Sequence, residues 1–433
     1  MNTFDSAASA AAWINGERWK GEKNGLQNTR ALLAALGDPQ KRMGTIWHVA
    51  GTNGKGSTCA FLDAALRELT PRVGLFTSPY LRFFNERIVF GGQPIPDEEL
   101  VQAASLVREK AELLAVQGIR CTTFELLTAC ACVYFERMGA EHAVMEVGMG
   151  GRLDSTNVLP AGVSLIAMIG MDHMGSLGDT IEKIAAEKAG IFKPGVPAAV
   201  MNQDKSVLEV FARAARKAGA PLYVTSEPEV TAFDAGGCEF RLLLPCSGEI
   251  RQRVNIPGLH QAKNAALALS ALDAALHSGL LPASSHESCL GAFSRGIQKA
   301  DWPGRLDMRG NVLIDCAHNP QGASALKEYA QAFFRDRRKV LLTGMMHDKQ
   351  VEACAKIFSS FADEVVATRV NWPRAMDEKE LAGVYPSCAG AFGSVKDALA
   401  FAQELAGPEG LVICAGSVYL AGEVINLLED RSH

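Results

Sequence analysis

The stretch HVAGTNGKGSTCAF, residues 48–61, joins a short apolar run to an amphipathic segment. The run at Thr45–Ala50 has the composition of a short buried strand, and residues 57–69 carry apolar side chains at helical spacing. A glycine-rich turn connects the two segments. The stretch therefore predicts a strand, a glycine loop and the start of a helix, which is the local unit of a nucleotide-binding α/β fold.

The glycine loop has the composition of a phosphate cradle. Its glycines are Gly51, Gly54 and Gly56. They let backbone N–H groups turn toward an anion, and Lys55 extends to the outer phosphates of a triphosphate. The general pattern for such loops differs at two positions, because Val49 stands where a glycine is usual and the hydroxyl is shifted to Ser57. A turn that only joins a strand to a helix is the alternative.

The length and composition indicate a two-domain enzyme. The chain has 433 residues, of which 48% are apolar and 21% charged, and a single core rarely extends over so many residues. A run of about eighteen apolar residues, as a membrane helix needs, does not occur. The first residues have neither a basic segment nor a long apolar one. We therefore expect a cytoplasmic protein without a membrane partner.

The net charge and the cysteine content narrow the class of protein further. The net charge is −5 and the isoelectric point about 6.0, without a basic tract, which argues against nucleic acid as a partner. The eleven cysteines stand mostly in apolar runs and lack the paired spacing of a zinc site. We expect them to be reduced and buried. An anionic substrate must then be bound by individual Lys and Arg side chains.

The order of patterns along the chain predicts two α/β domains. Strand-like runs at 45–50, 73–77, 143–147 and 164–169 alternate with helical patterns at 97–116 and 123–137, which is typical of a doubly wound, mostly parallel sheet. Residues 222–256 read as a small antiparallel add-on sheet, followed by a helix over 261–277. We expect one domain over 1–296. A second, smaller Rossmann-like α/β domain over 297–433 has strands at 312–315, 340–343, 365–368 and 411–415.

Polar residues follow the predicted strands, at the sheet edge where ligands bind in such folds. Glu146 ends one strand and is a candidate carboxylate for Mg²⁺, and Asp172 and His173 follow the next. Lys188 lies on the apolar stripe of a predicted helix. A lysine there either extends to water or loses its charge in a dry site and reacts with CO₂ to form a carbamate.

The second domain repeats this arrangement. Asp315 ends a predicted strand, where a ribose hydroxyl is a natural partner, and His318 follows three residues later. Asn264 stands at a helix start, and Arg305 lies on the segment between the domains, where its planar guanidinium suits phosphate oxygens. Site residues in both domains imply that ATP binds between them and that closure excludes water.

Nine ordered stretches together resemble the Mur ligase superfamily and, within it, the folylpolyglutamate synthases and dihydrofolate synthases. The stretches are GTNGKGS (51–57), TSPYLRFFNERI (77–88), TTFELLTA (122–129), EVGMGGRLDSTN (146–157), MDH (171–173), EKAGIFKPG (187–195), GLHQAKNAALA (258–268), DCAHNPQG (315–322) and AGSVYLAGEV (415–424). The motifs TSP, NERI and GGRLD, in this order, resemble those of the folate enzymes and not those of the peptidoglycan ligases. Tyr80 departs from the family pattern, in which histidine commonly follows SP.

The resemblance implies an ATP-dependent ligase that adds L-glutamate to a folate-type carboxylate through an acyl phosphate, acting as a monomer. It also implies a role for each matching residue. The nucleotide would be bound by Gly51, Thr52, Asn53, Gly54, Lys55, Gly56, Ser57, Asn264, Arg305 and Asp315. Mg²⁺ would be held by Ser57, Ser78, Glu146 and His173. The carbamylated lysine would be Lys188. The pterin pocket would be lined by Thr122, Phe124, Glu125, Gly151, Arg152, Leu153 and Asp154. His318 and Ser417 would lie near the incoming glutamate.

Two other functions remain open at the level of sequence. A peptidoglycan-type Mur ligase would share the nucleotide loop, but it usually has a further domain for a nucleotide sugar, and only about forty residues precede the loop here. A nucleotide switch that couples ATP hydrolysis to a partner would need neither a carbamylated lysine nor a second substrate pocket. The acceptor, dihydropteroate or a reduced folate, is also left open.

Overall fold

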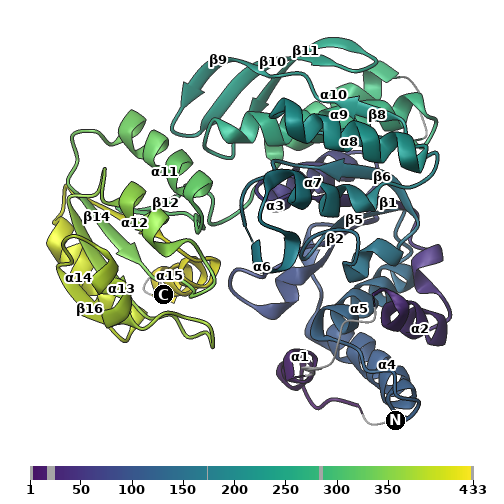
Figure 1. Ribbon diagram of the computed structural model, residues 1–433, viewed down its shortest axis with the longest axis horizontal. Helices are drawn as coiled ribbons and strands as arrows, with labels where there is room; N and C mark the ends of the chain where they lie inside the picture. Colours follow the sequence, from purple (N-terminus) through teal and green to yellow (C-terminus); the bar gives the residue numbers. More distant parts are fainter. Residues whose placement is uncertain (1–2, 17–24, 173, 282–285, 431–433) are drawn as a thin grey trace.

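The computed structural model describes residues 3–16, 25–172, 174–281 and 286–430. Two α/β units lie side by side, and a third, smaller sheet covers one end of the first unit (Figure 1). The predicted fold class is thereby confirmed, including the antiparallel add-on sheet and the Rossmann-like C-terminal unit. Among the described residues, no helix is long and apolar enough to cross a membrane.

The first unit contains an eight-stranded sheet in the order β4-β3-β2-β5-β1-β6-β7-β8. The strands are β1 (Thr45–Ala50), β2 (Val73–Phe76), β3 (Ile88–Phe90), β4 (Gln93–Pro94), β5 (His142–Glu146), β6 (Ala161–Ile166), β7 (Ala198–Val200) and β8 (Leu222–Val224). The pairs from β2 to β8 are parallel, and β3 and β4 add an antiparallel edge. The carboxyl ends of the parallel strands therefore meet at one edge of the sheet.

Helices cover both faces of this sheet. They are α1 (Ala7–Gly16), α2 (Gln27–Ala35), α3 (Lys55–Arg67), α4 (Asp97–Val116), α5 (Thr123–Arg137), α6 (Met174–Leu177), α7 (Ile181–Lys188), α8 (Lys205–Ala218), α9 (His260–His277) and α10 (His286–Lys299). Side chains of β1 alternate between the faces: Trp47 and Val49 pack in the core formed with α3 and α9, whereas Ile46 packs in the core formed with α2, α4 and α5.

The add-on sheet has the order β11-β10-β9 and packs on α9 and α10. Its strands are β9 (Glu229–Asp234), β10 (Gly237–Leu244) and β11 (Gly248–Val254). The prediction that this sheet starts at residue 222 is wrong, because β8 pairs in parallel with β7 in the large sheet. A strand of three residues is too short for the alternation of apolar and polar side chains to show which sheet it joins.

The C-terminal unit contains a six-stranded sheet in the order β12-β13-β17-β14-β15-β16, in which only β12 is antiparallel to its neighbour. Its strands are β12 (Asp307–Arg309), β13 (Val312–Ile314), β14 (Lys339–Thr343), β15 (Glu364–Thr368), β16 (Gly390–Phe392) and β17 (Leu411–Ala415). Its helices are α11 (Pro320–Phe333), α12 (Val351–Phe358), α13 (Glu378–Val384), α14 (Val395–Ala406) and α15 (Val418–Asp430). The boundary that the sequence suggests after residue 296 falls inside α10, which packs against α3 of the first unit.

Candidate active site

The glycine loop connects β1 to α3 and is fixed to the segment after β6. The backbone N–H groups of Thr52 and Asn53 both donate to the carbonyl of Met168, at 2.8 and 3.2 Å. Gly54 adopts a φ of +85°, and a Cβ there would lie 2.2 Å from Oδ1 of Asn264. Only glycine fits this turn. The loop and the N-terminus of α3 therefore form a cradle that suits a chain of phosphates.

A buried carboxylate faces the loop lysine. Glu146 ends β5 with 4% of its surface exposed, and its Oε2 accepts a hydrogen bond from the backbone N–H of Ser78 at 2.9 Å. Nζ of Lys55 lies 3.9 Å from its Oε1. Burial raises the pKa of Glu146, and the Lys55 cation and the Ser78 N–H group oppose that shift. A divalent cation would offset the same desolvation, and carboxylate and hydroxyl oxygens are ligands that Mg²⁺ prefers.

Lys188 points toward the glycine loop and not toward water. It ends α7 with 4% of its surface exposed, and its Nζ donates to the carbonyl of Gly51 at 2.8 Å. Burial and, to a lesser extent, the neighbouring Lys55 cation lower the pKa of Lys188 to about 7, against the opposing charges of Asp172 and Asp154. A substantial share of this amine is therefore neutral near pH 7, and a neutral amine reacts with CO₂ where an ammonium does not.

The C-terminal unit presents Asp315 directly after β13. Its Oδ2 accepts from the N–H of Leu306 at 2.9 Å, and its Oδ1 accepts from the N–H of Ala317 at 2.8 Å. Burial raises the pKa of Asp315, and the Arg305 cation and these two donors oppose the shift. Each carboxylate oxygen can accept a second hydrogen bond. Asp315 thus holds the interdomain segment and retains acceptor capacity for a ligand hydroxyl.

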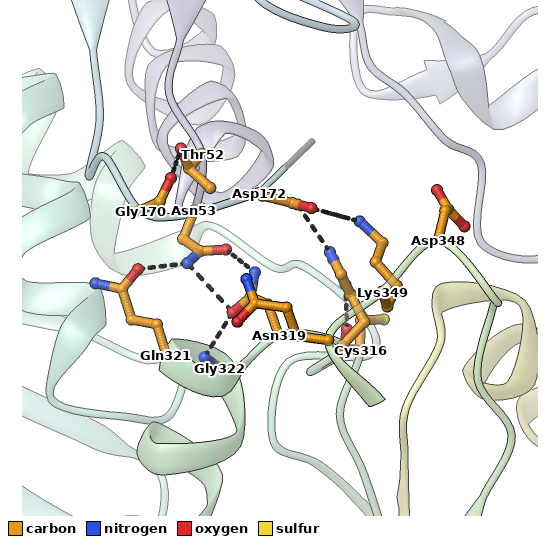
Figure 2. Close-up of polar contacts among 12 residues, drawn as sticks. Thr52, Asn53, Gly170, Asp172, Cys316, Asn319, Gln321, Gly322, Asp348 and Lys349 are labelled. Carbon is orange, nitrogen blue, oxygen red and sulfur yellow. Dashed lines mark hydrogen bonds and ion pairs between the residues drawn. The ribbon is translucent and has the colours of Figure 1, made fainter. Parts of the chain in front are cut away.

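Polar contacts join the two units around the glycine loop (Figure 2). Nδ2 of Asn319, a residue 5% exposed, donates to Oδ1 of Asn53 at 2.8 Å, and Nδ2 of Asn53 donates to Oε1 of Gln321. Nζ of Lys349 lies 3.0 and 3.1 Å from the two carboxylate oxygens of Asp172. The nucleotide loop and the segment after β6 are therefore bonded directly to the C-terminal unit.

His318 has a fixed orientation at this boundary. Its Nδ1 lies 3.0 Å from the carbonyl oxygen of Cys316, and its Nε2 lies 3.9 Å from Oδ2 of Asp172. A carbonyl only accepts hydrogen bonds, so Nδ1 is the protonated nitrogen of the neutral ring. The lone pair of the neutral ring is then on Nε2, on the side of Asp172.

One crevice between the units, with a volume of about 760 Å³, brings most of the predicted site residues together. It is lined by Gly51, Thr52, Asn53, Gly54, Lys55, Gly56, Ser57, Ser78, Phe124, Glu146, Asp154, Lys188, Asn264, Arg305, Asp315, His318 and Ser417. His173 lies outside the described residues. The crevice therefore places a phosphate cradle, a buried carboxylate and basic side chains from both units around one space.

Five other residues predicted for the pterin pocket do not line this crevice. Thr122 and Glu125 form a capping box at the start of α5, and Glu125 also accepts a hydrogen bond from Thr29. The others are Gly151, which packs on the backbone of α7, Arg152, which pairs with Glu187, and Leu153, which is 47% exposed. A role of these residues in binding the acceptor stays a prediction.

The crevice also contains residues to which the sequence assigned no role. Arg87 lies with its guanidinium carbon 5.0 Å from the ring centre of Tyr80, which takes the place of the usual histidine, and 5.8 Å from that of Phe84. Burial lowers the pKa of His260 to about 4. Lys349 follows the end of β14, so the rule that ligands bind beyond strand ends would have found it.

Comparison with known proteins identifies the family to which the chain belongs. The chain matches the model of the Mur ligase middle domain over residues 98–272 and that of the Mur ligase glutamate ligase domain over residues 304–418. It is 34% identical to the dihydrofolate synthase/folylpolyglutamate synthase of Bacillus subtilis, with 97% of this chain and 99% of the relative covered. It is 31% identical to the Escherichia coli enzyme of the same name, with 99% and 98% covered.

Solved structures agree with these matches. The Mycobacterium tuberculosis folylpolyglutamate synthase complexed with ADP superimposes with a TM-score of 0.87 at 31% identity, covering 98% of this chain and 99% of that one. E. coli FolC in complex with DHPP and ADP superimposes with a TM-score of 0.86 at 29% identity, covering 99% of both chains. The chain therefore belongs to the dihydrofolate synthase/folylpolyglutamate synthase family and is an ATP-dependent ligase with the Mur ligase fold.

Proposed function

We propose that this chain joins L-glutamate to the carboxylate of a folate-type acceptor, either dihydropteroate or a reduced folate, at the expense of ATP. The observation that carries the proposal is the crevice in which the glycine loop, the Lys55–Glu146 pair and Lys188 lie opposite His318 of the other unit. A phosphate site and a proton acceptor on facing domains suit a reaction in which phosphoryl transfer precedes attack by an amine.

The chemistry needs an activated acceptor, because a carboxylate oxygen is a poor leaving group. Transfer of the γ-phosphate to the acceptor carboxylate gives an acyl phosphate, and the amine of glutamate displaces phosphate from it. Lys55 lies where two anions would meet and offsets their charge as it builds in the transition state. His318 accepts the proton of the amine at Nε2, since its Nδ1 proton is held by the carbonyl of Cys316.

Mg²⁺ would be held by Ser57, Ser78, Glu146 and His173, and when bound it supplies charge neutralisation at the phosphate oxygens. Lys188 would be carbamylated. A carbamate bears a negative charge next to the loop, whereas the ammonium form would repel a cation there. Both assignments rest on the resemblance and on the burial of Glu146 and Lys188 beside the loop.

The nucleotide would contact the loop residues together with Asn264, Arg305 and Asp315. The acceptor would lie near Phe124, whose ring leaves room only for glycine at position 148. The remaining acceptor contacts are proposed for Thr122, Glu125 and Gly151–Asp154, and glutamate is proposed to bind near His318 and Ser417. We also propose that the enzyme is a cytoplasmic monomer without a nucleic-acid or membrane partner. Its oligomeric state is tested by light scattering.

Full-length matches to folate enzymes support this proposal over a peptidoglycan-type ligase or a nucleotide switch. The test is an ADP-release assay with ATP, Mg²⁺ and glutamate, run with dihydropteroate and with tetrahydrofolate in parallel. We expect ADP release to require both glutamate and at least one of the two acceptors, and mass spectrometry to find the acceptor extended by one glutamate. Release without glutamate, or with a peptidoglycan precursor alone, would overturn the proposal.

A further inference from the structure

A cluster of metal-binding side chains lies where the add-on sheet meets α9. Among the described residues, Cys246, Asp273 and His277 each offer one ligand atom, and these atoms lie within 4.8 Å of one another. Cys246 stands in the turn between β10 and β11, and the other two stand one helical turn apart on α9. None of the three lines the crevice between the domains.

The cluster is ordered by hydrogen bonds before any metal binds. Asp273 has no exposed side-chain surface, and its Oδ2 accepts from the backbone N–H of Cys246 at 2.7 Å. Its Oδ1 accepts from the hydroxyl of Ser247 and lies 3.6 Å from Nδ1 of His277. A buried carboxylate therefore holds the thiol-bearing turn against the imidazole, on the side where Cys246 and His277 are exposed.

The ligand types select a class of metal. A thiolate, an imidazole and a carboxylate together suit Zn²⁺, whereas Mg²⁺ and Ca²⁺ take oxygen ligands. Tetrahedral zinc with bonds of about 2.0–2.3 Å places its ligand atoms about 3.3–3.8 Å apart. For zinc to bind, the exposed side chains of Cys246 and His277 must rotate to close this gap while the buried Asp273 stays in place.

His286 is a candidate for the fourth ligand. His286 begins α10, and its ring centre lies 4.9 Å from that of His277. We propose that Cys246, Asp273 and His277 bind one Zn²⁺, with His286 or water in the fourth position, and that the ion fastens the β10–β11 turn to α9. The site joins residues 31 positions apart, which is why the spacing of the cysteines in the sequence does not indicate it.

The test uses the full-length chain, freed of metal with a chelator and kept in excess Mg²⁺ to occupy cation sites in the crevice. Isothermal titration with Zn²⁺ should give one site per chain that Cys246→Ala and His277→Gln each weaken at least 10-fold. Cys388→Ala, which changes the other cysteine that is not fully buried, should leave zinc affinity unchanged. Co²⁺ should give a thiolate charge-transfer band that is lost only in Cys246→Ala.

Further measurements distinguish a zinc site from a turn that is held only by the hydrogen bonds of Asp273. At the same concentration, zinc should raise the melting temperature of the parent chain and of Cys388→Ala more than that of Cys246→Ala, because a ligand that binds only the folded state stabilises it more the more tightly it binds. His286→Ala distinguishes the fourth ligand from water by whether affinity falls. Equal zinc affinity in the parent chain, Cys246→Ala and His277→Gln, or no thiolate band with Co²⁺, would overturn the site and leave Asp273 as an anchor of the turn.

Discussion

The side-chain amides of Asn53 and Asn319 meet across the two α/β units, 266 residues apart in the chain, with Nδ2 of Asn319 donating to Oδ1 of Asn53 at 2.8 Å. Oδ1 of Asn319 also accepts from the N–H of Gly322 and so caps α11. The side chain of Asn319 thus caps α11 of the C-terminal unit and also forms a hydrogen bond to the nucleotide loop of the first unit.

Asn319→Ser should separate these two roles. Serine still caps a helix N-terminus, but it is too short to bond Asn53. A lost buried hydrogen bond costs about 1–1.5 kcal/mol, so we expect the KM for ATP to rise about 5- to 10-fold with little change in melting temperature. Asn371→Ser, at an exposed position in the same unit, is the control. An unchanged KM would show that the contact does not support nucleotide binding.

Lys55→Ala should abolish ligation without unfolding the chain, because Lys55 faces the crevice and not a hydrophobic core. We expect kcat to fall at least about 100-fold, in line with roughly 3 kcal/mol for one electrostatic group at a transition state. Steady-state kinetics and a melting curve measure the two effects separately. Lys41→Ala, at an exposed lysine paired with Asp38, should behave as the parent. Near-normal turnover in folded Lys55→Ala would refute the role.

Glu146→Gln should raise the Mg²⁺ concentration needed for half-maximal rate about 10-fold or more, because the amide keeps an acceptor for the Ser78 N–H group but loses the charge that attracts the cation. His173→Ala should act in the same direction. Magnesium titrations of the rate provide the measurement. Glu141→Gln, at a half-exposed acid just before the same strand, serves as the control. Titrations that coincide for all four proteins would count against the metal site.

Lys188 should form a carbamate whose amount depends on pH. Its pKa of about 7 lies far below the usual value, so the amine is an unreactive ammonium below that pH and becomes reactive as the pH rises through it. With ¹³C-labelled CO₂ at constant concentration, a carbamate resonance should rise as the pH is raised through 7 and beyond, because more of the amine becomes neutral and because its reaction with CO₂ releases a proton. It should vanish in Lys188→Ala and persist in Lys183→Ala, an exposed lysine of the same helix.

Lys188→Ala should also lose activity sharply and recover part of it with added short carboxylic acids, which replace the missing anion. Full activity without any added acid, together with no carbamate resonance in the parent chain, would return Lys188 to a purely structural role.

Local sequence signals explain why the ends of some helices could be predicted correctly. Both α4 and α5 have the bounds that the sequence predicts. Three acidic residues follow Pro96 in the first turn of α4, where they favour the helix dipole. Thr122 and Glu125 form the capping box of α5, a T-x-x-E pattern that the sequence contains. Read as a cap, that pattern would have given these two residues a structural role as well.

Other features depend on contacts that no local pattern contains. β7 and β8 have three residues each, and their place in the large sheet is set by pairing with β6 and with each other. The position of Asp315 at a strand end predicts its place in the site, but no local pattern indicates its bond to the N–H of Leu306 or the φ of +50° at that leucine. The pairing of Asn53 with Asn319 exists only once the two units are packed.

The central claim is that an acyl phosphate of the acceptor precedes the amide bond, and isotope transfer tests it most directly. The acceptor is labelled with ¹⁸O in its carboxylate and incubated with ATP, Mg²⁺ and glutamate. We predict that each amide bond formed is accompanied by one ADP and by one phosphate that contains a single ¹⁸O atom from the acceptor. Phosphate without the label, released at the same rate when glutamate is omitted, would contradict the account.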